Sequence, residues 1–170
     1  MGSGKSSVGQ ATADHLGWKF FDSDAQVVAT TGRSVPEIFD EVGESAMHDV
    51  EKAALVEALG AGSRSVVAVA GGVVLTSQNR GLLMESGVVV WLRARVATLA
   101  LRVGDGQGRP YLDVDPMRAL ADLYAQRRPL YESVADVVID VDDLTIEEVV
   151  QRVLDESHFV RDDPVGERSD

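Results

Sequence analysis

Two runs of consecutive apolar residues place the strongest constraint on how this chain can fold. Residues 65–69 read Ser-Val-Val-Ala-Val, and residues 88–92 read Val-Val-Val-Trp-Leu. Strands with no polar alternation are typical of a parallel sheet whose two faces are both covered by helices. Because helix signals surround the two runs, the sequence predicts an α/β fold with a parallel sheet flanked by helices.

The other expected elements follow from the spacing of apolar residues, from capping residues and from Gly or Pro stops. We expect both apolar runs to be strands that are buried on both faces. The remaining elements are strands at 18–21 and 137–139 and helices at 4–16, 25–31, 34–39, 44–59, 76–85, 96–103, 116–132 and 145–156.

The composition limits the class of protein. A length of 170 residues fits one domain, which we place at residues 1–157, followed by a polar tail at 158–170. The net charge of −12 disfavours binding to nucleic acid. No apolar run is long enough to span a membrane, no secretory signal is visible, and no cysteine is present. We therefore expect a cytoplasmic protein without disulfides.

The first residues match the end of a phosphate-binding loop, G-x-x-x-x-G-K-[ST]. Glycines there let backbone N–H groups converge on phosphate oxygens, Lys5 adds a point charge for the β and γ phosphates, and the hydroxyl of Ser6 can ligate Mg²⁺. A Gly/Ser-rich tail has the same composition, but this segment runs into an expected helix. The predicted nucleotide-binding residues are Gly2, Ser3, Gly4, Lys5, Ser6 and Ser7.

The loop pattern is incomplete at its start. Its first Gly would lie upstream of Met1, and no strand precedes the loop. In a parallel sheet with a phosphate loop that strand is central, so its loss would expose the edges of two neighbours. We therefore expect either a misassigned start or a truncated sequence. The upstream in-frame DNA tests this expectation: it should encode an apolar run ending in Gly, and a stop codon there would contradict it.

An ordered series of motifs resembles the shikimate kinase family, and the resemblance covers nearly the whole chain. A phosphate loop alone is shared by many unrelated enzymes, whereas the full series is specific in its order and spacing. It consists of Gly-Ser-Gly-Lys-Ser at 2–6, Phe-Asp-Ser-Asp at 21–24, Thr-Gly-Arg-Ser at 31–34, Ile-Phe at 38–39, Gly-Glu at 43–44, Gly-Gly at 71–72, Gly-Arg-Pro at 108–110 and Arg-Arg-Pro-Leu-Tyr at 127–131. The resemblance implies a P-loop fold like that of nucleoside monophosphate kinases, with substrate-binding helices at about 24–60 and a mobile lid at about 104–115.

The resemblance also implies roles for individual residues. Asp22 lies near Mg²⁺, and Asp24 accepts a hydrogen bond from the hydroxyl that attacks the γ-phosphate. Arg127 binds a substrate carboxylate with its planar fork. Arg109 is the lid arginine that closes over the transferring phosphates, and Arg102 stacks on the adenine. Without the family, Asp-Ser-Asp reads as a turn with a helix cap, and the two helical arginines read as solvated surface residues.

Three departures from the family pattern concern the acceptor pocket and the adenine site. His48 stands where members carry an arginine that helps to bind the substrate carboxylate, and an imidazole is a weaker anion partner. Residues 70–72 read Ala-Gly-Gly in place of three glycines, and residues 142–143 read Asp-Asp where an arginine is expected near the adenine. The predicted substrate-binding residues are Asp24, His48, Gly71, Gly72 and Arg127.

The resemblance implies a monomeric enzyme that uses ATP and Mg²⁺ to phosphorylate the 3-hydroxyl of shikimate, a small-molecule substrate. Its expected catalytic residues are Lys5, Asp24 and Arg109. Two alternatives stay open. The first is a kinase of a related cyclitol or polyol that lacks the carboxylate, which His48 motivates. The second is a nucleotide-binding regulatory module without turnover, which the accumulated departures and the incomplete loop motivate.

Overall fold

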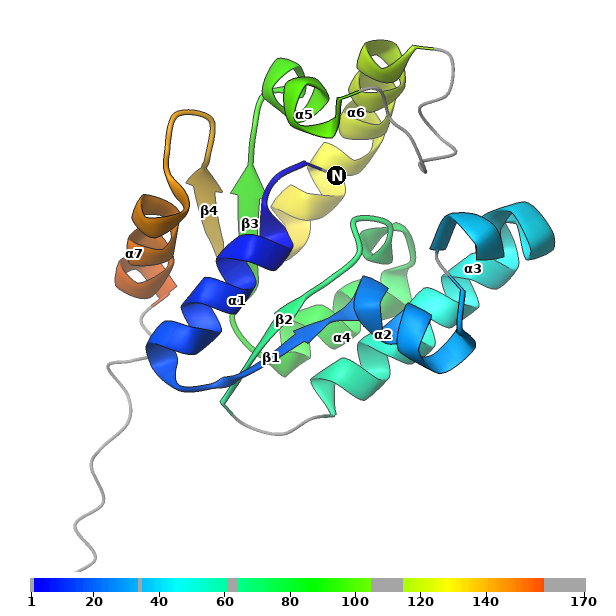
Figure 1. Ribbon diagram of the computed structural model, residues 1–170, viewed down its shortest axis with the longest axis horizontal. Coiled ribbons are helices and arrows are strands. Elements are labelled where there is room, and N and C mark those ends of the chain that lie inside the picture. Colours follow the sequence, from blue (N-terminus) through cyan, green and yellow to red (C-terminus); the bar gives the residue numbers. More distant parts are fainter. Residues whose placement is uncertain (1, 34, 61–63, 105–114, 158–170) are drawn as a thin grey trace, which may run out of the picture.

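The computed structural model describes residues 2–33, 35–60, 64–104 and 115–157. The chain alternates helices and strands along its whole described length (Figure 1). The elements are α1 (Lys5–Leu16), β1 (Lys19–Asp22), α2 (Ser23–Thr31), α3 (Val35–Leu59), β2 (Ser65–Ala68), the short 3-10 helix η1 (Val73–Leu75), α4 (Ser77–Ser86), β3 (Val90–Arg93), α5 (Val96–Val103), α6 (Pro116–Val134), β4 (Val137–Asp140) and α7 (Ile146–Ser157).

The strands form two separate parallel pairs. β1 pairs with β2 in a register that runs from Lys19 opposite Ser65 to Asp22 opposite Ala68. β3 pairs with β4, from Val90 opposite Val137 onward. Among the described residues each pair is a two-stranded sheet, and no ladder joins β2 to β3. The predicted α/β class with parallel strands and flanking helices is confirmed, and the described strands form two sheets instead of one.

The two apolar runs are less buried than their sequence predicts. Every residue of β3 is only half-buried, and in β2 only Ala68 is fully buried. Val88, at the start of the second run, is 46% exposed. The prediction that both strands are buried on both faces is therefore wrong for this structure. The physical reason is that each strand pairs along one edge and leaves the other edge and its flanking side chains uncovered.

The buried apolar residues that the structure describes fall into three clusters instead of one core. The largest joins α1, α5, α6, α7 and β4, with Ile139 and Val149 at its centre. A second cluster joins η1, α4 and the end of α6 around Leu55 of α3. A third, around Val27, fastens α2 to α3. Figure 1 shows α1 crossing in front of β3, with α7 beside β4.

Helix α3 is longer than expected. The sequence predicts two helices, 34–39 and 44–59, separated near Gly43, whereas one helix runs from Val35 to Leu59. A glycine inside a helix costs only about 1 kcal/mol relative to alanine, and it breaks no hydrogen bond as a proline would. The expected interruption was therefore wrong, because this penalty is small beside the packing of α3 on α2 and η1.

Two helices, α6 and α7, begin at residues with well-formed caps. The side chain of Asp115 accepts a hydrogen bond from the Arg118 amide, and Pro116 occupies the first helical position of α6. At α7 the Thr145 amide donates to Glu148, and the Glu148 amide donates back to the Thr145 hydroxyl. This reciprocal pair of hydrogen bonds is a capping box. The hydrogen bonds from Thr145 hold the pKa of Glu148 below its ordinary value.

Candidate active site

The phosphate loop leads directly into α1, as the sequence predicts. Gly4 is the residue before the helix. Its φ of 88° is a left-handed backbone conformation that is unfavourable for residues with a Cβ atom. The helix then begins at Lys5, so its first N–H groups and its positive end face the loop. Gly2 packs against Leu99 and Val103 of α5. This geometry can hold an anion at the start of α1.

Four polar side chains from α1 and the β1–α2 junction meet beside the loop. Lys5 Nζ donates to Asp24 Oδ2 at 2.9 Å and lies 4.0 Å from Asp22 Oδ2. The Ser6 hydroxyl donates to Asp22 Oδ2 at 2.5 Å. The predicted catalytic lysine and both predicted aspartates are therefore brought together. Ser6 and Asp22 present two oxygen donors at one point, which is the donor type that Mg²⁺ prefers.

The end of β1 fixes these carboxylates in place. Asp22 is the last residue of the strand, and its Oδ1 accepts hydrogen bonds from the amides of Asp24 and Ala25. It therefore caps α2, as the helix-cap interpretation expects, while its other oxygen faces Ser6, and its role beside Mg²⁺ stays a prediction. The neighbouring Ser23 is buried, and its hydroxyl accepts a hydrogen bond from the Ala70 amide. This bond ties the ends of β1 and β2 together.

Arg127 lies on α6 opposite the turn that follows β2. Its Nε is buried and has no hydrogen-bond partner among the described residues. A Cβ atom added to Gly71 would lie 3.7 Å from Arg127 Nη1 and 3.1 Å from the Tyr131 hydroxyl. Tyr131 donates a hydrogen bond to the Gly71 carbonyl at 2.8 Å. A buried and unpaired guanidinium donor beside an open glycine backbone can accept an anionic ligand.

One cavity of about 530 Å³ connects the two groups. Ser3 and Lys5 from the phosphate loop line it, and so do Gly71 and Arg127. Its volume lies within the range of about 300–1,000 Å³ that is usual for small-molecule sites. The cavity therefore joins a phosphate-binding loop to a guanidinium that can bind a carboxylate.

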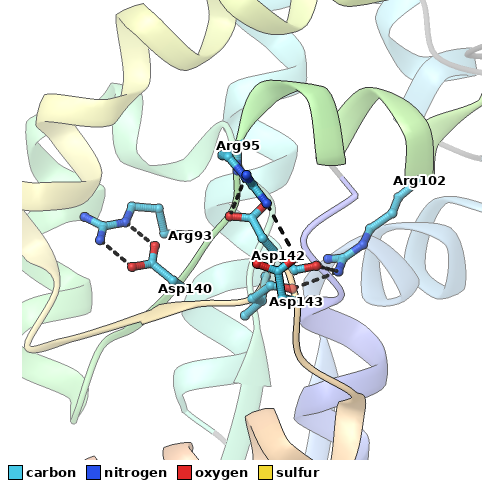
Figure 2. A network of polar contacts seen from close by, with 7 residues as sticks. Arg93, Arg95, Arg102, Asp140, Asp142 and Asp143 are labelled. Carbon is cyan, nitrogen blue, oxygen red and sulfur yellow. Dashed lines mark hydrogen bonds and ion pairs between the residues drawn. The ribbon is translucent and has the colours of Figure 1, made fainter.

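Arg102 lies at the end of α5 and binds the loop after β4 (Figure 2). Its Nη2 donates to the carbonyl oxygen of Val141 at 2.8 Å and contacts that of Asp142 at 3.5 Å. The predicted adenine residue is thus next to the Asp142–Asp143 pair that stands in place of the family's arginine. Arg95 forms ion pairs with both aspartates, at 3.4 and 3.5 Å.

Asp142 also caps α5 from a distant part of the chain. Its Oδ1 accepts a hydrogen bond from the Arg95 amide at 3.0 Å, just before the first residue of the helix. The Thr98 hydroxyl, the Arg95 amide and the Arg95 charge together hold the pKa of Asp142 below its ordinary value. The adjacent Arg93 and Asp140 make a bidentate pair at 2.6 and 2.7 Å, which lowers the pKa of the Asp140 carboxyl.

Other predicted site residues are not part of this geometry. Gly72 precedes η1 with φ of −78°, which any residue can adopt, and it does not line the cavity. Ser7 is exposed on α1. Arg109 and nearly all of the predicted lid at 104–115 lie outside the described residues, as does the tail at 158–170. His48 belongs to α3, but its side chain also lies outside the described part of the chain.

Sequence reasoning assigned no role to Tyr131, Ser23 or Asn79. Tyr131 lies one helical turn after Arg127, so its spacing within the motif at 127–131 was a usable signal. Ser23 was visible only as the middle residue of Asp-Ser-Asp. Asn79 is 2% exposed, and its Oδ1 has no hydrogen-bond partner among the described residues. Nothing in the local sequence distinguishes it.

These elements and this site define a class of protein, the P-loop kinases that act on small molecules. A family model described as shikimate kinase matches residues 1–158. The chain therefore belongs to the shikimate kinase family. Within the described residues, no helix is long and apolar enough to cross a membrane.

Individual relatives agree with this assignment. Shikimate kinase of Ralstonia nicotianae is 42% identical over 155 residues, covering 91% of this chain and 81% of the relative. That of Halorhodospira halophila is 42% identical over 156 residues, covering 91% and 88%. Among solved structures, shikimate kinase from Acinetobacter baumannii in complex with shikimate superposes with a TM-score of 0.88 at 32% identity, covering 97% of this chain and 90% of that one.

Proposed function

We propose that this chain transfers the γ-phosphoryl group of ATP to the 3-hydroxyl of shikimate and releases ADP and shikimate 3-phosphate. The observation that carries the proposal is that Lys5 and Arg127 line the same cavity. One end of the cavity suits a nucleotide phosphate, and the other suits the carboxylate of the acceptor. Membership of the shikimate kinase family supports the same reaction.

The described side chains divide the chemical work. Lys5 provides a point charge for the β and γ phosphates, together with the backbone N–H groups at the start of α1. The Asp24 carboxylate orients the attacking hydroxyl and accepts its proton. Ser6 and Asp22 would hold Mg²⁺, which offsets phosphate charge when bound, and phosphate and water oxygens would complete its coordination. Arg109 of the predicted lid would cover the phosphates.

The ion pair between Lys5 and Asp24 links the two halves of this machinery. Each group neutralises the other at 2.9 Å. When the phosphates of ATP bind Lys5, the Asp24 carboxylate loses its partner. It can then accept a hydrogen bond from the hydroxyl of the acceptor. The lysine and the carboxylate are therefore placed to exchange partners within one site, which puts both at the point of phosphoryl transfer.

The test is an assay of ADP release with ATP and Mg²⁺, using shikimate and a panel of cyclitols without a carboxylate. We expect turnover that depends on shikimate, and phosphorus NMR should place the product phosphate on the 3-hydroxyl. Turnover with a cyclitol alone would favour the altered acceptor that His48 motivates. Nucleotide binding without acceptor-dependent turnover would favour the regulatory module.

We also propose that a monomer is sufficient, because one chain supplies both the phosphate-binding and the guanidinium side chains of the cavity. Sedimentation of the active protein at assay concentration tests this. A dimer that loses activity on dilution would contradict it.

A further inference from the structure

We propose that Ser23 is a positioning residue for phosphoryl transfer. Its buried hydroxyl fixes the acceptor turn, residues 70–71, relative to Asp24, while Tyr131 fixes the same turn relative to Arg127. The inference rests on the proposed function and deepens it. It adds a residue that determines how the acceptor is aligned without itself touching ATP or shikimate.

The first link joins the start of α2 to the end of β2. Ser23 is the first residue of α2 and is 3% exposed, and its hydroxyl accepts a hydrogen bond from the Ala70 amide at 2.8 Å. The β1–β2 ladder ends where Asp22 lies opposite Ala68, so this bond continues the connection after β1 has turned into α2. Ala70 is 7% exposed, so water reaches its amide poorly. Without the hydroxyl this buried donor loses its acceptor, and the turn must shift or admit water to replace it.

The segment that carries Ser23 is held independently of the turn. Asp22 Oδ1 accepts hydrogen bonds from the amides of Asp24 and Ala25, so one cap fixes the backbone around Ser23. Lys5 Nζ also donates to Asp24 Oδ2 at 2.9 Å. When the bond from the hydroxyl is removed, the acceptor turn therefore moves relative to Asp24, and Asp24 keeps its place.

The second link joins the acceptor turn to α6. The Tyr131 hydroxyl donates to the Gly71 carbonyl at 2.8 Å. The Tyr131 ring packs against Trp91, with ring centroids 5.5 Å apart, and this contact limits its movement. Tyr131 lies one helical turn after Arg127 on α6, so the acceptor turn has a defined position beside the guanidinium.

The acceptor turn thus connects two groups that act on different ends of the acceptor. In the proposed reaction Arg127 binds the carboxylate and Asp24 orients the attacking hydroxyl, and both substituents belong to one small ring. The hydroxyl lies in line with the γ-phosphate only when the separation of the two groups matches that ring. Ala70, Gly71 and Arg127 are among the described residues that line the cavity, and Ser23 is not. Ser23 therefore acts through the turn.

The experiment compares three substitutions of Ser23. Ser23→Ala removes the hydroxyl, Ser23→Cys keeps nearly the same shape with a weak acceptor, and Ser23→Thr keeps the hydroxyl. Thr145→Ala is the matched control, because the Thr145 hydroxyl also accepts a hydrogen bond from a backbone amide, that of Glu148 at 3.2 Å, but lies before α7. For each protein, kcat and the KM for shikimate are measured at saturating ATP. Hydrogen exchange at the Ala70 amide reports the bond itself.

We expect Ser23→Ala to lower kcat about 10- to 100-fold, because the acceptor is misaligned. The KM for shikimate should stay within about threefold, since Arg127 and Tyr131 are unchanged. Exchange at the Ala70 amide should become at least about tenfold faster. The kcat of Ser23→Cys should lie between those of Ser23→Ala and wild type, and Ser23→Thr and Thr145→Ala should keep kcat within about threefold. A general loss of stability would not produce this split between kcat and KM, nor its reversal in Ser23→Thr.

The role of Ser23 is overturned if wild type phosphorylates shikimate and Ser23→Ala does so with the same kcat. An equal loss of kcat in Thr145→Ala, or a rise in KM without a fall in kcat, overturns it as well. If Ser23→Ala does not fold, Ser23→Cys decides the question by the same readouts. A wild-type chain without shikimate-dependent turnover would instead refute the proposed function, and with it this inference, whatever the variants show.

Discussion

Replacing Arg127 with methionine is expected to weaken binding of the acceptor without lowering the free energy of unfolding. The guanidinium Nε is buried without a hydrogen-bond partner among the described residues. An unsatisfied buried donor costs about 1–3 kcal/mol, and methionine retains most of the apolar volume of the side chain. We therefore expect the free energy of unfolding of Arg127→Met to be unchanged or higher by about 1–2 kcal/mol.

The same change is expected to weaken acceptor binding strongly. A charged hydrogen bond is worth about 1.5–3 kcal/mol, and a fork can make two of them with a carboxylate. A loss of about 2–4 kcal/mol corresponds to an increase of about 30- to 1,000-fold in KM for shikimate. The KM for ATP should stay within about twofold, because Lys5 and the start of α1 are untouched.

The assay is steady-state ADP release with shikimate varied at saturating ATP, alongside chemical denaturation of the same samples. Arg128→Met is the matched control, since Arg128 is the next residue, is exposed and pairs with Glu132 at 2.8 Å. Breaking that surface pair should cost at most about 1 kcal/mol and leave KM unchanged. If Arg127→Met unfolds more easily while shikimate KM stays the same, Arg127 is a structural residue and the reasoning fails.

Three further predictions concern the rest of the site. Asp24→Asn should lower kcat about 10²- to 10⁴-fold, because it removes the proton acceptor. Nucleotide binding measured by calorimetry should not weaken, because the change also removes the carboxylate that competes with the phosphates for Lys5. Asp142→Asn should lower stability by about 1 kcal/mol at pH 7, because the carboxylate charge that pairs with Arg95 and strengthens the hydrogen bond from the Arg95 amide is lost. Because the pKa of Asp142 is depressed in the folded protein, this difference should be present above about pH 4 and vanish as pH falls through the folded pKa in denaturation series. Gly71→Ala should raise shikimate KM at least about tenfold, since its methyl group would press on the Tyr131 hydroxyl at 3.1 Å.

Each of these has an outcome that would count against it. Unchanged kcat in Asp24→Asn would remove Asp24 from the proton path. A stability difference for Asp142→Asn that persists at pH 2 would show that the cap acts without its charge. Wild-type KM in Gly71→Ala would mean that the turn after β2 moves freely. Tyr131→Phe is the matched test, because it removes only the hydroxyl that donates to the Gly71 carbonyl.

Much of the site could be predicted because its signals are local. The phosphate loop is followed at once by its helix, and the two aspartates follow a strand, so their meeting with Lys5 needs only that α1 and β1 be neighbours. The contact between Tyr131 and Gly71 joins residues 60 positions apart, and no local periodicity encodes it. The same holds for Asp142, which caps a helix that lies 47 residues earlier in the chain at Arg95.

The differences in the fold have physical causes that sequence patterns do not carry. An apolar run predicts a strand that is stable when both of its faces are buried. It does not show whether neighbouring elements cover those faces. That is why β2 and β3 are half-buried although their sequences were interpreted correctly as strands. Gly43 likewise reads as a helix break, whereas packing along a 25-residue helix outweighs its small penalty.

The division of the apolar core has a consequence for folding cooperativity. Helices α1 and α6 make the extensive packing contacts between the part built on β1 and β2 and the part built on β3 and β4. Parts whose buried apolar clusters are separate can open separately, with different free energies. Calorimetry should therefore give a total enthalpy larger than the van't Hoff enthalpy, the sign of unfolding in more than one step. The contacts of α1 and α6 therefore determine how cooperatively the two parts unfold.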